Sequence, residues 1–146
     1  MPRETIAIAA DHAGFELKAL LKHVLEERGF GVLDLGTDSA DSTDYPDFAH
    51  ALARAIEDGR VRRGVLICGS GIGMGMAANR HRGVRAAPCL DRETARLARQ
   101  HNDANVLALG ARLVRPEAAV ECLDAFIETP FEGAERHTRR LAKLDP

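Results

Sequence analysis

Residues 65–79 read Val-Leu-Ile-Cys-Gly-Ser-Gly-Ile-Gly-Met-Gly-Met-Ala-Ala-Asn, and this stretch decides the fold. It begins as a short apolar run typical of a buried strand, continues with four glycines at alternate positions, and ends in residues that suit a helix. A strand, a glycine-rich turn and a helix N-terminus leave several backbone N–H groups unpaired and directed at one point, where the helix dipole is positive. The stretch therefore predicts an anion-binding turn.

Cys68 is the candidate reactive residue of this turn. It ends the predicted strand directly before the glycines, where unpaired N–H groups would stabilise a thiolate. A Walker A loop requires a Gly-Lys-Ser/Thr ending that no window here provides, and the dinucleotide pattern fits only in a relaxed form that starts at Gly73, too late for the turn. Two simpler interpretations stay open: the glycines only let helix and sheet pack closely, and Cys68 is an inert core thiol.

Apolar runs alternate with segments of helical periodicity along the whole chain. The predicted strands are residues 5–10, 31–35, 65–68, 84–89 and 105–109. A helix follows each of them, and a last, strongly charged helix is expected over about residues 132–144. This alternation predicts a single α/β domain over residues 1–146, with a five-stranded parallel sheet covered by helices on both faces.

The composition excludes several classes of protein. A chain of 146 residues that is 45% hydrophobic and 29% charged is typical of one globular domain. The net charge of −2 gives no broad basic surface for nucleic acid, and no apolar run is long enough for a signal peptide or a membrane span. Cys68, Cys89 and Cys122 are odd in number and widely spaced, which favours neither a disulfide framework nor a zinc site. We therefore expect a cytoplasmic protein.

Polar and glycine-rich segments follow several of the predicted strands. Right-handed crossovers place every strand-to-helix turn along the carboxyl edge of the sheet, which is where such folds bind ligands. The segments expected to converge there are Asp11-His12, the polar loop that ends at Tyr45, the turn from Cys68 to Gly75, and Arg112.

Several of these polar residues also have structural interpretations. Asp11 could be a helix cap with no further role. His101 could likewise do no more than cap a helix C-terminus, where a positive charge is favoured. Arg136 and Arg140 lie four residues apart on one face of the last helix, and a solvated charged surface is the default for such a segment.

Six motifs taken together resemble the B-type ribose-5-phosphate isomerases, a family that includes allose-6-phosphate and galactose-6-phosphate isomerases. The motifs are Asp11-His12-Ala-Gly, Asp44-Tyr45-Pro46, Cys68-Gly-Ser-Gly-Ile-Gly, Ala77-Ala78-Asn79, Gln100-His101-Asn102-Asp103-Ala-Asn105-Val-Leu and Gly110-Ala-Arg112. The resemblance runs from about Ile6 to Leu144. It implies a Rossmann-like three-layer α/β/α sandwich, a homodimer with its sites at the subunit interface, sometimes paired into tetramers, and a reaction that uses no metal or cofactor.

The resemblance also implies catalytic roles. Cys68 resembles the base that moves a proton between C1 and C2 of the sugar, and Ser70 the hydroxyl that helps to move protons on O1 and O2. His101 resembles the acid that opens the furanose ring, assisted by Asp11. Some relatives carry a glutamate in the loop in place of the cysteine, and this chain has no acidic residue between Gly69 and Asn79.

Substrate contacts follow from the same resemblance. The loop backbone resembles the hole that holds the enediolate oxygen, and its residues are Gly69, Gly71, Ile72, Gly73, Met74 and Gly75. Tyr45 and Asn102 resemble sugar-hydroxyl contacts. The residues that resemble phosphate ligands are His12, Arg112, Arg136 and Arg140. His101, Asn102 and Arg112 are expected to come from the neighbouring subunit.

The residue types suit this chemistry, because abstracting a proton next to a carbonyl needs a base and an oxyanion hole. Two arginines one helical turn apart can grip a phosphate dianion. We therefore expect a cytoplasmic aldose–ketose isomerase of the pentose phosphate pathway that interconverts ribose 5-phosphate and ribulose 5-phosphate. The alternatives are an isomerase of another phosphorylated sugar, such as allose 6-phosphate, galactose 6-phosphate or a tetrulose phosphate, and a non-catalytic binder of sugar phosphates or nucleotides.

Overall fold

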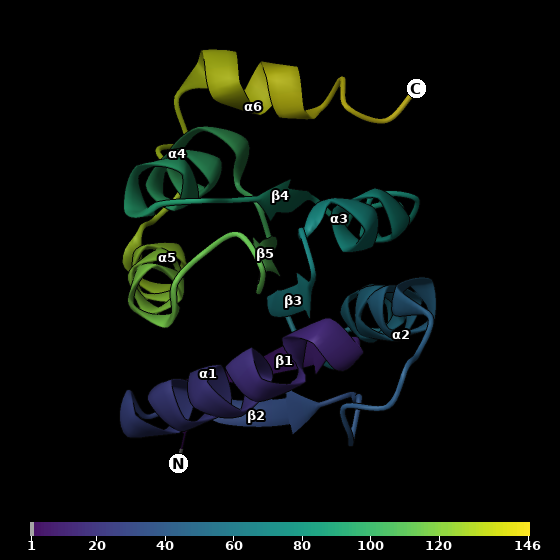
Figure 1. Ribbon diagram of the computed structural model, residues 1–146. Helices are drawn as coiled ribbons and strands as arrows, with labels where there is room; N and C mark the ends of the chain where they lie inside the picture. The colour runs from purple at the N-terminus through teal and green to yellow at the C-terminus, as the bar shows by residue number, and fades with distance from the viewer. Residues whose placement is uncertain (1) are drawn as a thin grey trace.

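The structure, a computed structural model, describes residues 2–146 and contains one parallel sheet between two layers of helices (Figure 1). The five strands lie in the order β2-β1-β3-β5-β4. Their bounds are β1 Thr5–Ala10, β2 Gly31–Asp34, β3 Gly64–Cys68, β4 Ala86–Pro88 and β5 Val106–Gly110. The predicted α/β/α sandwich with five parallel strands is confirmed.

The helices cover both faces of this sheet. Their bounds are η1 His12–Gly14 (a 3₁₀ turn), α1 Phe15–Glu27, α2 Tyr45–Glu57, α3 Ile72–Ala78, α4 Arg92–Asn102, α5 Pro116–Glu128 and α6 Glu135–Leu141. Helices α1, α4 and α5 bury apolar side chains with one face of the sheet, and α2 and α3 do so with the other. Two hydrophobic cores therefore hold the sheet from both sides, as expected for parallel strands that are apolar along their whole length.

The three central strands position the functional edge. Every residue of β3 and β5 is buried, as are the last five residues of β1. The register sets Ala10 opposite Ile67, and Cys68 opposite Gly110. Because the strands are parallel and in this register, the turns that follow β1, β3 and β5 emerge side by side at one carboxyl edge.

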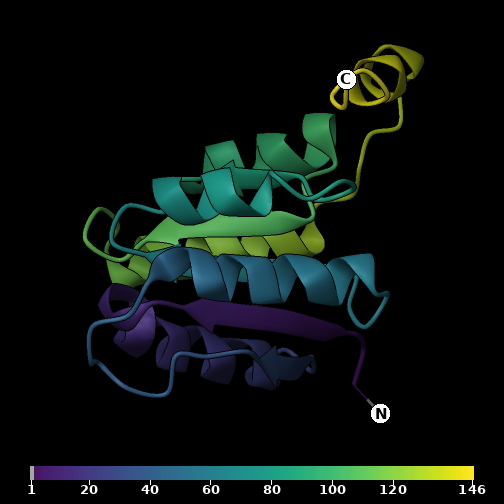
Figure 2. The same cartoon turned by 90° about the vertical axis from the view of Figure 1, so that its right-hand side faces the viewer.

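The C-terminal segment differs from the sequence-based expectation. The helix predicted over residues 132–144 covers only Glu135–Leu141. It begins later because Gly133 has a φ of +74°, outside the helical region, and because Glu132 N donates to Gln100 O at the end of α4. Figure 2 shows α6 standing apart from the sheet, near the end of the molecule where the strands begin.

Two smaller differences concern β4 and α4. The strand predicted over residues 84–89 is the three-residue β4 at the edge of the sheet. Asp91 caps α4 with a capping box, as the sequence predicts, but the helix continues through Asn102, so His101 lies in its last turn. None of the helices in residues 2–146 combines the length and the apolar character that crossing a membrane requires.

Candidate functional site

The turns after β1, β3 and β5 are hydrogen-bonded directly to one another. Asp11 N donates to Ile67 O at 3.1 Å, and Ala111 N donates to Cys68 O at 2.8 Å. Arg112 N donates to Gly69 O at 3.0 Å. These bonds lock three segments that are far apart in the sequence into one rigid platform around Cys68.

Cys68 is the centre of this platform. Its side chain ends β3 and the residue is 4% exposed. Gly71 N donates to Cys68 Sγ at 3.1 Å, an arrangement that suits a thiolate acceptor. Gly71 has a φ of +79°, and a Cβ there would lie 2.9 Å from the carbonyl carbon of Leu109, so the turn that brings the amide over the sulfur requires glycine.

The first turn of α3 presents further donors beside the sulfur. Ile72 N donates to Ser70 Oγ at 3.2 Å, so the Ser70 hydroxyl keeps its own proton for another acceptor. The amides of Gly73 and Met74 have no acceptor within the described residues 2–146, because they belong to the unpaired start of the helix. This loop can therefore donate hydrogen bonds to an oxyanion.

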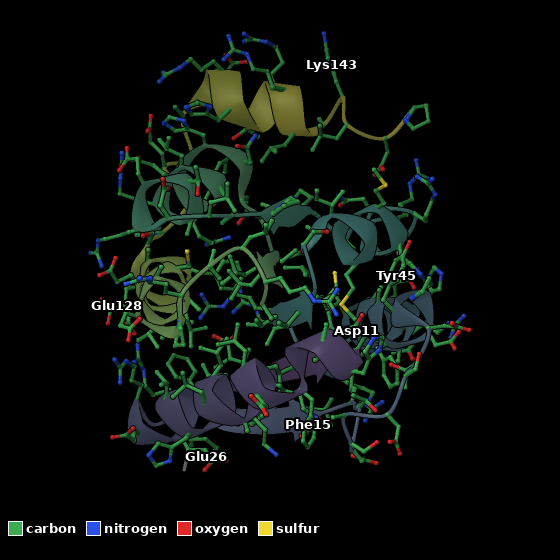
Figure 3. All side chains as sticks on the ribbon, in the orientation of Figure 1. Asp11, Phe15, Glu26, Tyr45, Glu128 and Lys143 are labelled. Carbon is green, nitrogen blue, oxygen red and sulfur yellow. The ribbon has the colours of Figure 1, made fainter. Side chains whose placement is uncertain are left out.

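Tyr45 lies against the same loop. It begins α2 and is 40% exposed. A Cβ added to Gly73 would lie 2.5 Å from the Tyr45 ring, so glycine is what allows the ring to lie over the loop. Figure 3 shows Asp11 and Tyr45 on the same side of the molecule, far from the C-terminal Lys143.

Asp11 and His12 are fixed by hydrogen bonds on the other side of Cys68. Asp11 is buried, and its Oδ1 accepts from Ala13 N at 3.0 Å and Gly14 N at 3.2 Å, so it does cap the 3₁₀ turn. His12 N donates to Thr43 Oγ1 at 3.2 Å, and Thr43 N donates to His12 Nδ1 at 3.1 Å. Because Nδ1 accepts, the neutral His12 ring carries its proton on Nε2, which remains a donor for a ligand.

Arg112 supplies positive charge to the platform. A Cβ added to Gly69 would lie 3.1 Å from Arg112 Nη1, so the guanidinium lies close over the residue that follows Cys68. Arg112 makes no ion pair with any residue in the part of the chain that the structure describes. The resemblance assigns Arg112 to a neighbouring subunit's site, whereas in this structure it lies beside its own chain's Cys68.

The remaining predicted residues lie at the opposite end of the molecule. Helix α4 starts after β4 at the carboxyl edge and returns to the amino edge, and its 11 residues span about 16 Å at 1.5 Å per residue. His101 and Asn102 are in its last turn, and Arg136 and Arg140 are on α6 beside it. One chain therefore holds two groups of predicted site residues that cannot meet.

This second group contains two residues that were not predicted to have a role, Glu132 and His137. The His101 and His137 rings are stacked, with centroids 4.6 Å apart and an interplanar angle of 14°. Glu132 Oε1 lies 3.7 Å from His137 Nε2 and 3.4 Å from Arg136 Nη2. Burial lowers the pKa of His137, and the nearby Arg136 and His101 lower it further. In the sequence His137 is visible only as one polar residue in a charged helix.

Comparison with known proteins gives consistent results. The profile of the Ribose/Galactose Isomerase family matches residues 6–144. Ribose-5-phosphate isomerase B of Escherichia coli is 46% identical over 139 residues, covering 95% of this chain and 93% of that protein. D-erythrulose-4-phosphate isomerase of Pectobacterium atrosepticum is 45% identical, over 88% of this chain and 86% of its own. The crystal structure of a ribose 5-phosphate isomerase from Thermotoga maritima has a TM-score of 0.95 and 50% identity, with 98% of both chains covered.

Proposed function

The chain belongs to the ribose/galactose isomerase family, and on this premise we propose that it interconverts ribose 5-phosphate and ribulose 5-phosphate. Its relatives are isomerases of phosphorylated sugars, and it is an enzyme of this kind, as predicted. The observation that carries the choice of mechanism is the contact of Gly71 N with Cys68 Sγ, beside the charge of Arg112.

In the proposed reaction the Cys68 thiolate removes the proton from C2 of the open-chain aldose and returns it to C1. The negative charge that develops on the carbonyl oxygen is held by the loop amides, including those of Gly73 and Met74. Ser70 donates its free hydroxyl proton and exchanges protons between O1 and O2. No cofactor takes part.

Ring opening precedes this step, because an aldopentose phosphate is mainly a furanose. We assign the proton transfer that opens the ring to His101, with Asp11 on the opposite side of the sugar. The exposed hydroxyl of Tyr45 and the amide of Asn102 are assigned to sugar hydroxyls. His12 Nε2, Arg112, Arg136 and Arg140 are assigned to the phosphate, where charge-assisted hydrogen bonds are strongest.

This division of roles requires a second chain. Cys68 and His101 lie at opposite edges of one sheet, so a complete site needs His101 from a neighbour. Large apolar side chains are exposed on the segments that follow the carboxyl ends of β3, β4 and β5, which supports an interface next to the site. They are Ile72, Met76, Leu90 and Leu113. We therefore propose a homodimer with shared sites, and a pair of such dimers would make a tetramer.

Two other functions remain alternatives. The similarity to an erythrulose-4-phosphate isomerase supports a different sugar phosphate as substrate, since the length of sugar that fits depends on the assembled site. A non-catalytic sugar-phosphate binder would use the same contacts without Cys68. All three cysteines are free, which supports the proposed cytoplasmic location. The proposed place in the pentose phosphate pathway follows from the proposed substrate.

The deciding experiment measures ketose formation from aldose phosphates of four, five and six carbons, for the wild-type chain and for Cys68→Ser. We expect the highest kcat/KM with ribose 5-phosphate and loss of turnover in Cys68→Ser. Cys89→Ala is the matched control, because Cys89 is equally buried but lies outside the site. A higher kcat/KM with another sugar phosphate would make that sugar the substrate instead of ribose 5-phosphate. Binding without turnover by the wild-type chain would favour a non-catalytic binder.

A further inference from the structure

We infer that His101, Glu132 and His137 form a binding site for a divalent transition-metal ion, with Zn²⁺ as the best match. Two imidazoles and one carboxylate are ligands that zinc commonly takes, and three protein ligands leave a fourth position for water or an anion. The metal ion would take no part in the proposed isomerisation, which needs no metal, although His101 is shared between the two roles.

The three side chains already face one another. One ligand atom from each lies within 4.8 Å of the others. His137 Nε2 is 3.7 Å from Glu132 Oε1, and His101 Nε2 is 3.9 Å from Glu132 Oε2. Ligand atoms about 2.0–2.1 Å from a tetrahedral zinc ion are about 3.3 Å apart, so closing the site needs small rotations of the side chains. Glu132 is exposed and can make them.

His137 gives independent evidence for a ligand at this place. It is 8% exposed, and its Nε2 is a buried side-chain atom without a hydrogen-bond partner in the described part of the chain. Buried polar atoms in proteins are nearly always paired. This nitrogen lies 3.7 Å from Glu132 Oε1, too far for a hydrogen bond, and a metal ion bound to both atoms would satisfy it.

A second cluster of the same composition shows the contrast. His50 Nδ1 lies 2.7 Å from His81 Nε2, and His81 Nδ1 lies 2.6 Å from Glu57 Oε1. Both nitrogens of His81 are therefore used by internal hydrogen bonds. In the α4–α6 cluster the nitrogen that faces Glu132 is not used, which makes that cluster the better metal site.

The surrounding charges limit the affinity but do not exclude a cation. Arg136 contacts Glu132 at 3.4 Å, and Arg140 lies one turn further along α6. A metal ion would replace Arg136 at the Glu132 carboxylate. Arg136 would then be free to hold an anion bound at the open position.

Two consequences follow from occupation of this site. The metal would link α6 and the segment before it to α4. It would also occupy His101 Nε2, so zinc should inhibit the isomerase. Only this expected inhibition rests on the proposed function, in which His101 opens the ring.

Metal binding is tested by calorimetric titration of metal-free protein with Zn²⁺, in the Cys68→Ser chain because thiolates also bind zinc. We expect one zinc ion per chain, and a loss of at least tenfold in affinity in both His137→Ala and the nearly isosteric Glu132→Gln. His23→Ala, which removes an exposed histidine on α1, is the matched control and should bind as before. Unchanged affinity in Glu132→Gln and His137→Ala, or loss in His81→Ala instead, would overturn the site.

Inhibition is tested in the wild-type chain with Zn²⁺ and then with a chelator. The expected result is inhibition that the chelator reverses and that weakens at least tenfold in Glu132→Gln. Equal inhibition of both chains would place the inhibitory zinc outside this cluster and overturn the predicted inhibition through His101. The titration does not depend on activity, so it decides the metal site even if the proposed function fails.

Discussion

The two ends of the sheet carry two kinds of site. At the carboxyl edge, functional side chains are attached to the ends of buried strands and are held by backbone bonds between three turns. At the amino edge, His101 and the arginines are attached to the end of one helix and to a seven-residue helix that stands away from the sheet. The first group is held in place by the fold of one chain, and the second group lies at the surface, away from the sheet.

This difference suggests a division of labour. Proton transfer at carbon tolerates little error in distance, and Cys68 ends a fully buried strand at the centre of the sheet. Ring opening by His101 and part of the phosphate binding, by Arg136 and Arg140, are assigned to residues at the surface of the amino edge, which reach a substrate only beside another chain. Four predictions test this division, from the largest expected effect to the smallest.

The largest effect is expected at Cys68. Cys68→Ser keeps the size of the side chain but replaces the base with a hydroxyl that stays protonated at neutral pH. We expect kcat to fall by roughly 10²–10⁴, the usual contribution of a positioned acid–base group, while substrate binding persists. Steady-state kinetics and calorimetry with ribose 5-phosphate measure the two quantities. A wild-type rate in this variant would show that a residue other than Cys68 is the base.

The arginines of α6 should affect binding instead. Arg136→Ala or Arg140→Ala should weaken substrate binding by about 2–5 kcal/mol, the range for removing one partner of a buried charged pair, with the fold unchanged. Arg139→Ala is the matched control, because Arg139 pairs with Glu135 on the same helix. An unchanged KM in both variants would favour the simpler interpretation, in which α6 is a solvated surface helix without a role in binding.

The need for two chains is tested by complementation. Separately, Cys68→Ala and His101→Ala should be inactive or nearly so. In an equal mixture with free exchange, half of the dimers are hybrids with one intact site of two, so up to about a quarter of the wild-type activity should return. Verified exchange without recovery would place both residues in one chain's site.

The smallest effect is a difference in labelling rate among the cysteines. Burial raises the pKa of Cys89 to about 11 and that of Cys122 to about 12, so both should stay protonated and unreactive to iodoacetamide at pH 8. Cys68 should label fastest, and ribose 5-phosphate should protect it. Mass spectrometry of peptides identifies the labelled residue. Faster labelling of Cys89 would contradict its place in the core.

The sequence alone predicted the parallel sheet, and it predicted that Asp11, Cys68 and Arg112 lie together at its carboxyl edge. The apolar run that ends at Cys68, bounded by glycines, predicts a buried strand, and parallel strands bring the turns that follow them to one edge. The family resemblance, and not the residue pattern, supplied the roles of His101 and Arg136. Both roles stay predictions.

The α4–α6 cluster could not be predicted, because it depends on tertiary packing. Nothing in the spacing of Glu132 and His137 places them at the end of α4. The bond from Glu132 N to Gln100 O, together with the left-handed Gly133, shortens the last helix and brings both side chains to His101. Charge runs show where a helix is exposed but not which neighbour it meets.

The paired bonds between His12 and Thr43 have a consequence for how far the polar loop can vary in length. Ala10 N donates to Gly36 O and Thr37 N donates to Ala10 O, so the polar loop is stapled to the body at its start as well as at Thr43. Only about five residues between the staples, 38–42, are free to change in length, at a small entropic cost. This segment can therefore gain or lose residues while the orientation of His12 and the start of α2 at Tyr45 stay the same.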